Sequence, residues 1–312
     1  MSDPTNSGFT EQSLAAIAPE SDDPPERGAA DPKDRRSPPS ASVLSESSDS
    51  PDSPVPPSSS PQRDEWDHPQ PAPLIRYLTY FLLLPLIAIA TVVFGVVSLI
   101  AGIWDKSGRQ QHGIARAWAN VLLRISFSPV TLVNRERLHV HNVAVYASNH
   151  LSYYDTPVLF AKLPFQFRIL AKQSLWKVPF IGWYLNRSGQ VPIDAKSSRS
   201  AIAGLLRCVK VLQSGMPLVL FPEGGRAEHG ETTPFQSGAA FMAIKAQVPL
   251  VPLALVGTYE LLPIHTYHLT PRPLKVVVGD PIPTIGLTTR DADALTARLY
   301  AAITTLYQQH LD

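Results

Sequence analysis

The sequence predicts an α/β fold: a largely parallel sheet covered by helices on both faces, preceded by an N-terminal membrane-embedded helical segment. Three observations lead to this prediction. The 28 residues from Tyr77 to Trp104 are uncharged and are mostly Leu, Ile, Val and Ala. From residue 130 onward, short apolar runs alternate with amphipathic stretches, which is the pattern of buried parallel strands joined by helices. Residues 1–73 contain few large apolar side chains, so we expect a disordered tail there.

The distribution of charge also separates residues 1–73 from the rest of the chain. Residues 1–73 hold 15 of the 31 prolines, and 14 Asp and Glu against 5 Lys and Arg, a net charge of −9. Because the whole chain carries +1, the remaining residues carry +10. The single cysteine, Cys208, excludes a disulfide framework and a Cys-rich zinc site. We therefore predict a tail over 1–73, membrane-embedded and interfacial helices over 74–128, and an α/β domain over 129–312.

The apolar stretch is long enough to cross a bilayer. A helix of this length measures about 42 Å, against a hydrocarbon core of about 30 Å. Two interpretations are open: one tilted span, or two shorter helices that dip into one leaflet and are separated at Pro85 or Gly95. A buried core helix is a third alternative. If the segment crosses the membrane, the basic residues that follow it place the α/β domain on the cytoplasmic side.

A basic amphipathic helix is predicted next, over Gln111–Phe127. Trp118, Leu122 and Ile125 share one face, and Arg116 and Arg124 lie off it. Such a helix either lies on a membrane surface or packs against the domain, and the pattern is compatible with both.

The α/β pattern begins at Val130. The predicted strands are Val130–Asn134, Val143–Ala147, Gln166–Ala171, Gln190–Ile193, Leu218–Phe221, Leu250–Val256 and Leu274–Val278. The predicted helices are Pro157–Leu163, Val178–Asn186, Ser198–Gln213, Ser237–Ala246 and Arg290–His310. Ligands of such sheets bind at the carboxyl ends of the strands, and polar segments follow two of these strands there.

The first polar segment places His150 five residues before Asp155, between a strand and a helix. In that position an Asp can hydrogen-bond one ring nitrogen of the His and leave the other to take a proton from a hydroxyl. The alternative is an ordinary helix N-terminus, with Asn149 or Ser152 as cap and Asp155 complementing the helix dipole. The spacing alone favours neither.

The second polar segment is Phe221-Pro222-Glu223-Gly224-Gly225-Arg226. Its two glycines let backbone N–H groups approach an anion, and Arg226 can bind a phosphate through two hydrogen bonds. Glu223 can orient Arg226 or accept a hydrogen bond from a substrate hydroxyl. Taken alone, the segment is equally typical of a plain turn.

Together these segments resemble the PlsC-like family of glycerolipid acyltransferases. Ser148–Asp155 resembles the family's NHxxxxD motif, and Phe221–Arg226 resembles its FPEGTR motif. Three further stretches, Ala171–Trp183, Gly189–Asp194 and Val248–Thr258, resemble other family segments in the family's order. The chain departs from the family pattern at Gly225, where Thr is usual, at Ala227, where Ser is usual, and at Ala195, where Arg is usual.

The resemblance implies a membrane-bound acyltransferase that moves a fatty acyl group from acyl-CoA or acyl-carrier protein to a glycerolipid hydroxyl. It implies His150 as general base held by Asp155, and Lys172, Glu223, Gly224, Gly225 and Arg226 as substrate-binding residues. The favoured acceptor is 1-acyl-glycerol-3-phosphate (lysophosphatidic acid). Glycerol-3-phosphate, a lysophospholipid or an amino-acid lipid are alternatives, and so is an inactive membrane-anchored lipid-binding protein. We expect no metal, no organic cofactor and no nucleic-acid partner.

Overall fold

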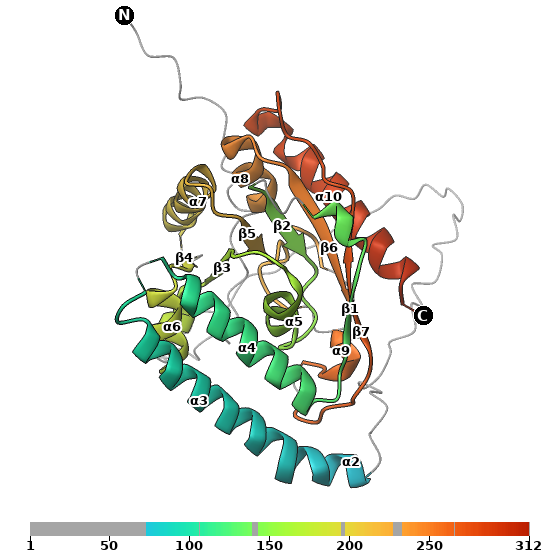
Figure 1. The fold of residues 1–312 in the computed structure, drawn as a ribbon. Coiled ribbons are helices and arrows are strands. Elements are labelled where there is room, and N and C mark those ends of the chain that lie inside the picture. The colour runs from blue at the N-terminus through green and yellow to red at the C-terminus, as the bar shows by residue number, and fades with distance from the viewer. Residues whose placement is uncertain are drawn as a thin grey trace, which may run out of the picture. The chain divides into compact units, whose positions relative to one another are not determined.

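A computed structural model describes residues 73–105, 107–138, 143–194, 197–226, 233–264 and 266–311 of the chain. Its described part is a single sheet with helices on both sides and a long helix along one end (Figure 1). The predicted α/β class is therefore confirmed. The predicted tail lies outside the described residues except at Pro73, which begins the first described helix.

The apolar stretch forms one continuous helical run. It comprises α2 (Pro73–Leu78), the π-helical turn η1 (Thr79–Leu83) and α3 (Leu84–Ala101). Proline lacks an N–H and its ring crowds the carbonyl one turn earlier. A π turn directly precedes Pro85, with the N–H of Leu84 bonded to the carbonyl of Thr79, and this wider turn accommodates the ring. The helix thus continues through Pro85 and Gly95, so the structure does not show two separate helices.

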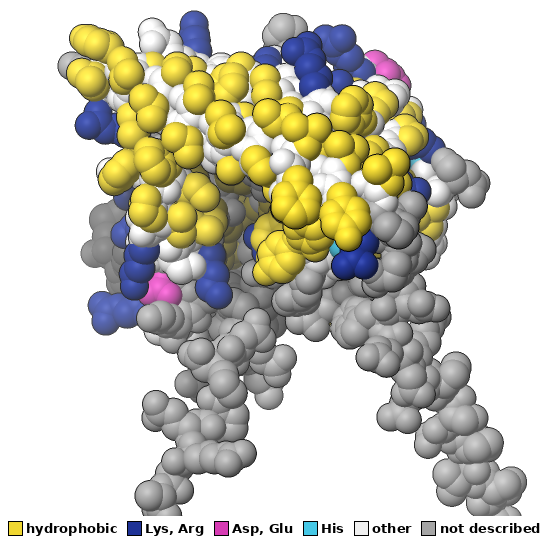
Figure 2. All heavy atoms as spheres, turned by 90° about the horizontal axis from the view of Figure 1, so that it is seen from below, with side chains coloured by type: hydrophobic (Ala, Val, Ile, Leu, Met, Phe, Trp, Pro, Cys, Tyr) yellow, Lys and Arg dark blue, Asp and Glu magenta, His cyan; other side chains and the backbone are white. Residues whose placement is uncertain are grey.

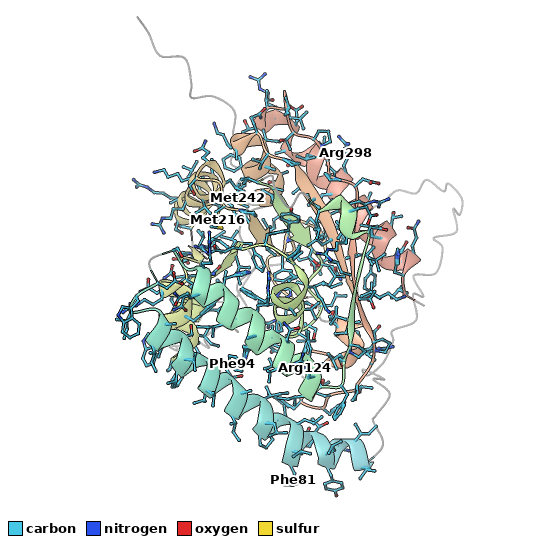
Figure 3. All side chains as sticks on the ribbon, in the orientation of Figure 1. Phe81, Phe94, Arg124, Met216, Met242 and Arg298 are labelled. Atoms are coloured by element: carbon cyan, nitrogen blue, oxygen red, sulfur yellow. The ribbon has the colours of Figure 1, made fainter. Side chains whose placement is uncertain are left out.

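The long helix packs on α4 (Arg109–Ile125), the predicted amphipathic helix. Polar side chains join the two helices. Trp118 Nε1 donates to Thr91 Oγ1 over 3.2 Å, and Gln111 Nε2 donates to the carbonyl of Ser98 over 2.6 Å. The opposite side of the long helix is open, and the side chain of Phe81 points away from the rest of the chain (Figure 3). The two helices therefore form one layer with a packed inner side and an uncovered outer side.

Seven strands form the sheet in the order β1-β7-β6-β2-β5-β3-β4. They are β1 (Val130–Val133), β2 (Val145–Ser148), β3 (Arg168–Lys172), β4 (Val191–Ile193), β5 (Leu218–Leu220), β6 (Leu250–Val256) and β7 (Leu274–Val278). Strands β2 to β6 are mutually parallel, whereas β7 runs antiparallel to β6 and β1 runs parallel to β7. The prediction of a largely parallel sheet is confirmed, with this reversed pair at one edge.

Each face of the sheet carries its own core. On one face, Tyr146 of β2 packs in the cluster that includes α4 and α5 (Asp155–Lys162). On the other face, Val145 and Ala147 pack against three helices, α7 (Ser198–Gln213), α8 (Gly238–Ala246) and α10 (Ala292–Gln309). Met242 of α8 is fully buried in this second core (Figure 3). This alternation along β2 is what a strand buried on both faces requires.

Short elements complete the chain. Two of them follow β3: the 3₁₀ turn η3 (Gln173–Lys177) and α6 (Ile181–Arg187). The others are η2 (Arg135–Arg137), α9 (Thr258–Leu261) and η4 (Thr289–Asp291). All seven predicted strands are present, and the five predicted helices of the α/β domain correspond to α5, α6, α7, α8 and α10.

Candidate functional site

The segment after β2 is fixed to the neighbouring strand by a buried amide. Asn149 Nδ2 donates to the carbonyl of Leu255 over 3.0 Å, and the N–H of Leu255 donates to Asn149 Oδ1 over 2.7 Å. The sequence suggested Asn149 as a helix cap, but its side chain instead pairs with β6. This pairing fixes the point at which the next residue, His150, leaves the sheet.

The structure brings His150 and Asp155 together, as the resemblance to the family motif implied. His150 Nδ1 lies 2.9 Å from Asp155 Oδ2. The same oxygen accepts hydrogen bonds from the N–H groups of Leu151 (2.7 Å) and Ser152 (2.8 Å), directly before α5 begins. Asp155 is fully buried, while the side chain of His150 is 15% exposed. Asp155 thus closes the turn at the start of the helix and also orients the imidazole.

The His150 ring is held on its face as well as on its edge. It stacks on the Phe221 ring with centroids 3.8 Å apart and planes 11° apart. Phe221 directly follows β5, the strand beside β2. Held at Nδ1 and on one face, the imidazole has little freedom to rotate. No hydrogen bond to Nε2 is formed by the described residues, which leaves that nitrogen available to a substrate.

Glu223 joins the second polar segment to the first. Its Oε1 accepts the backbone N–H of His150 over 2.9 Å, and its Oε2 accepts the hydroxyl of Thr233 over 3.2 Å. The side chain is buried, and this burial raises the pKa of Glu223 to about 7, although the two hydrogen bonds act in the opposite direction. The carboxylate therefore braces the backbone at His150, and the structure shows no contact of Glu223 with Arg226.

The two glycines after Glu223 differ in what they permit. Gly224 has φ +76°, and a Cβ there would lie 2.5 Å from Gln236 Nε2. A side chain at that position would be both strained and crowded. A Cβ at Gly225 meets nothing within 4 Å among the described residues. The Thr that is usual in the family at this position would therefore fit.

Arg226 is exposed and lies over an aromatic ring. Its Cζ is 4.0 Å from the centroid of the Tyr153 ring, which belongs to the segment between His150 and Asp155. Neither Tyr153 nor Phe221 is among the predicted site residues, although both stand inside the two motifs. Their presence in the same motifs as His150 and Arg226 was the feature of the sequence that could have indicated these contacts.

Lys172 stands apart from these residues. It ends β3, which is separated from β2 by β5, and it is exposed. Its position at the carboxyl edge of the sheet fits a contact with substrate, but the described structure does not join it to the other predicted residues. Ala195 and Ala227 lie outside the described residues.

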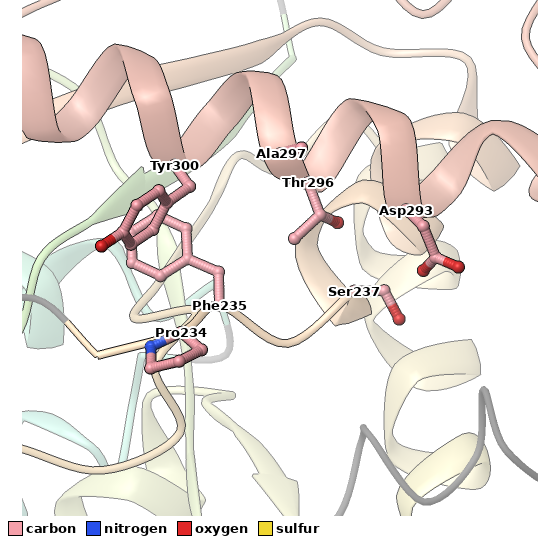
Figure 4. Close-up of a pocket in the computed structure, with 7 residues that line it drawn as sticks. All are labelled: Pro234, Phe235, Ser237, Asp293, Thr296, Ala297 and Tyr300. Carbon is pink, nitrogen blue, oxygen red and sulfur yellow. The ribbon is translucent and has the colours of Figure 1, made fainter. Parts of the chain in front are cut away.

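The loop that carries Glu223 is anchored at its far end. The N–H of Gln236 donates to the carbonyl of Pro222 over 2.8 Å. Phe235 packs edge-to-face on Tyr300 of α10, with ring centroids 5.0 Å apart. The two rings line an open groove of about 510 Å³ together with Pro234, Ser237, Asp293, Thr296 and Ala297 (Figure 4). We interpret this contact as the anchor that holds Thr233 against Glu223.

Comparison with known proteins identifies the class. A family model described as "Acyltransferase" matches residues 129–256. An uncharacterized acyltransferase of Schizosaccharomyces pombe is 30% identical over 234 residues, which cover 71% of this chain and 81% of that protein. A chloroplastic 1-acyl-sn-glycerol-3-phosphate acyltransferase of Brassica napus is 30% identical over 205 residues, covering 63% of this chain and 59% of the relative.

A solved structure agrees with the fold. The crystal structure of the 1-acyl-sn-glycerophosphate (LPA) acyltransferase PlsC from Thermotoga maritima superimposes with a TM-score of 0.62 at 21% identity, covering 74% of this chain and 92% of that chain. This chain has the fold and the family that its sequence predicted. It belongs to the acyltransferase family whose members include 1-acyl-sn-glycerol-3-phosphate acyltransferases. The chain spans about half the length of the first curated plant and algal relatives it matches.

The burial of Glu223 generates a prediction about pH. Its pKa rises from a usual value of 4.5 to about 7 on folding. Between these values the folded state holds a proton that the unfolded state has lost, so the free energy of unfolding falls as pH rises from about 4.5 to 7. In Glu223→Gln, the amide oxygen can still accept the N–H of His150 while the amide nitrogen donates to the hydroxyl of Thr233, and the titration is removed. We expect this variant to match the wild type near pH 4.5 and to exceed it by about 2–3 kcal/mol at pH 8.

Chemical unfolding at several pH values measures this difference. Asp293→Asn, a change at an exposed carboxylate, serves as the control and should leave the pH dependence of the wild type in place. A Glu223→Gln variant that is less stable than the wild type at pH 8 would contradict the predicted protonation.

Proposed function

We propose that this acyltransferase moves a fatty acyl group from an acyl thioester to the free hydroxyl of 1-acyl-glycerol-3-phosphate, with His150 as general base. The observation that carries the proposal is the hydrogen bond of 2.9 Å between His150 Nδ1 and the buried Asp155 carboxylate. It leaves Nε2 directed away from the carboxylate, in the side chain's exposed part. The names of the relatives, which are 1-acyl-sn-glycerol-3-phosphate acyltransferases, support this acceptor.

The proposed reaction is a direct transfer. His150 Nε2 takes the proton of the acceptor hydroxyl while that oxygen attacks the thioester carbonyl. The buried carboxylate of Asp155 accepts the Nδ1–H and stabilises the imidazolium as it forms. When the tetrahedral intermediate collapses, the C–S bond breaks and the imidazolium returns the proton to the leaving thiolate. The products are phosphatidic acid and the free thiol of coenzyme A or of an acyl-carrier protein.

Removal of the base tests the mechanism. We expect His150→Ala to lower kcat by at least about 10²–10⁴-fold, because the acceptor hydroxyl then loses its general base. Asp155→Asn should cost less but still about 10²-fold, since the imidazole loses its orientation. Transfer of a labelled acyl group measures both. His310→Ala, a change at a histidine near the chain end, is the control. Activity of His150→Ala within a few-fold of the wild type would overturn the proposal.

We propose Arg226 as the group that binds the acceptor phosphate. It is exposed at the carboxyl edge of the sheet, and it directly follows Gly225, where the space beside the backbone is open to an approaching anion. Guanidinium groups bind phosphate oxygens through charge-assisted hydrogen bonds. A neutral acceptor has no group that can use this contact, so Arg226 should distinguish phosphorylated acceptors from neutral ones.

The acceptor is tested with two substrates. Arg226→Ala should lower kcat/KM for lysophosphatidic acid by about 10- to 200-fold, the effect of losing about 1.5–3 kcal/mol. It should change the rate with a monoacylglycerol by less than about two-fold. Arg207→Ala, at an exposed position of α7, controls for the loss of a surface charge. An equal loss for both acceptors would show that Arg226 is structural and would remove this assignment.

We propose that the long helix lies in the plane of the membrane rather than across it. Its outer side exposes apolar side chains, listed here: Leu74, Tyr77, Phe81, Ile89, Val93, Val96 and Ile100. Figure 2 shows that hydrophobic side chains dominate this face and that Lys and Arg lie at its margins. The inner side is bonded to α4, which carries Arg109, Arg116 and Arg124. A transmembrane orientation would draw these arginines into the hydrocarbon, at a cost of several kcal/mol each.

This placement fits the sequence's prediction of membrane attachment. The helix Leu74–Ala101 contains an 18-residue window with a mean hydropathy of 2.7, and only 11% of that window is buried. The apolar face then enters one leaflet, and the basic margin meets anionic head groups. We assign the α/β body to the cytoplasmic side, where anionic lipids attract its basic residues.

Labelling of single cysteines distinguishes the two orientations. Arg76→Cys places a thiol in the first turns of the long helix, and Gln110→Cys places one beyond its other end, at the start of α4. Cys208 does not interfere, because it is buried and this burial raises the pKa of its thiol to about 12. In sealed vesicles, the in-plane orientation predicts that an impermeant maleimide labels both variants from the same side. Labelling from opposite sides would show a membrane-spanning helix, and release of the protein by salt alone would refute the apolar anchor.

A further inference from the structure

The contact between Arg226 and Tyr153 links the acceptor site to the base. The guanidinium carbon lies 4.0 Å from the centroid of the Tyr153 ring. Among the described residues, the Tyr153 ring is the partner that the structure shows for this guanidinium. The carboxylate of Glu223, which precedes it in the motif, is bonded to His150 and Thr233 instead. A cation over an aromatic face is attracted by the negative charge of the ring's π system. The planar guanidinium keeps its N–H edges in solvent, where they can meet phosphate oxygens.

Tyr153 itself is 50% exposed, but its neighbours are fixed. On one side, Ser152 Oγ donates to the carbonyl of Leu262 over 2.9 Å. On the other side, the hydroxyl of the buried Tyr154 is hydrogen-bonded to the hydroxyl of Ser126. The backbone N–H of Ser152 is also bonded to Asp155. The Tyr153 ring therefore stands on the same braced turn that orients the His150 imidazole.

An arginine that follows two glycines needs such a support. Its side chain has many rotamers, and glycine adds backbone freedom. Without the ring, the guanidinium would sample many positions relative to His150. With the ring in place, one short segment, residues 150–155, positions both the phosphate-binding group and the base.

We propose that Tyr153 is a positioning residue that determines acceptor specificity. Its ring holds Arg226 at a fixed distance from His150, so that a phosphate bound by the guanidinium brings the acceptor hydroxyl to Nε2. This inference rests on the proposed role of Arg226. The contact with the guanidinium is made by the ring face and not by the phenolic hydroxyl. An aromatic residue is therefore required at this position, and phenylalanine suffices.

The test compares Tyr153→Leu with Tyr153→Phe, using lysophosphatidic acid and a monoacylglycerol at a fixed concentration of acyl donor. We expect Tyr153→Leu to raise KM for lysophosphatidic acid by about 3- to 10-fold, to change kcat by less than two-fold, and to leave the monoacylglycerol unaffected. Tyr153→Phe should behave as the wild type. Tyr267→Leu, at a tyrosine that is 71% exposed, is the matched control.

A double variant provides the sharpest readout. If the ring acts through the guanidinium, Tyr153→Leu should have no further effect on KM for lysophosphatidic acid once Arg226 is Ala. Additive effects in this double variant would overturn the proposal. So would an equal loss for both acceptors in Tyr153→Leu, or a loss in Tyr153→Phe as large as that in Tyr153→Leu.

The design separates this inference from the function beneath it. If Arg226→Ala lowers kcat/KM only for the phosphorylated acceptor while Tyr153→Leu does not, the proposed role of Tyr153 is wrong and the proposed phosphate site stands. If Arg226→Ala lowers kcat/KM equally for both acceptors, the proposed phosphate site is wrong, and the inference about Tyr153 is wrong with it. Tyr153 is half exposed, so thermal unfolding should show Tyr153→Leu to be as stable as the control.

Discussion

One buried oxygen, Asp155 Oδ2, organises the candidate site. It accepts the imidazole N–H of His150 and two backbone N–H groups in the turn before α5. Each of these donors would otherwise be buried without a partner, at a cost of about 1–3 kcal/mol. The start of the helix, the shape of the turn and the orientation of the base therefore depend on a single carboxylate. This explains why an Asp is suited to both interpretations of the segment.

The sheet order brings the second segment to the first. In the sheet, β2 lies between β5 and β6, and all three strands are parallel, so their carboxyl ends meet at one edge. Glu223 and Phe221 follow β5 and meet His150 there, while Asn149 reaches across to β6. The site thus rests on strand neighbours that are about 70 to 105 residues apart in the chain, and the contact between Glu223 and the backbone of His150 is a product of topology alone.

The sequence predicted the features that depend on local interactions, and it missed those that depend on contacts between distant parts of the chain. Local patterns identified all seven strands. The spacing of His150 and Asp155 left their pairing open, because the same residues suit an ordinary helix N-terminus, and the resemblance to the family motif was needed to imply it. Strand direction was beyond such patterns: the apolar run of β7 has the same composition whether it runs parallel or antiparallel to β6. The stacking of Arg226 on Tyr153 likewise depends on the order of the strands. The π turn before Pro85 depends on how the proline ring fits into the long helix.

The long helix shows how packing decides what hydropathy leaves open. Its composition leaves a span and a re-entrant pair open, but Thr91 and Ser98 are bonded to α4 and give the helix an inner side. Phe180, just before α6, lies beside this helix at Gly95, where an added Cβ would be 3.5 Å from the Phe180 side chain. Next to it, Val178 and the α6 residues Ile181 and Trp183 are exposed. The apolar face therefore continues from the long helix toward the carboxyl edge of the sheet. In the proposed reaction, this continuity would let a lipid acceptor keep its acyl chain in the membrane while its polar end reaches His150.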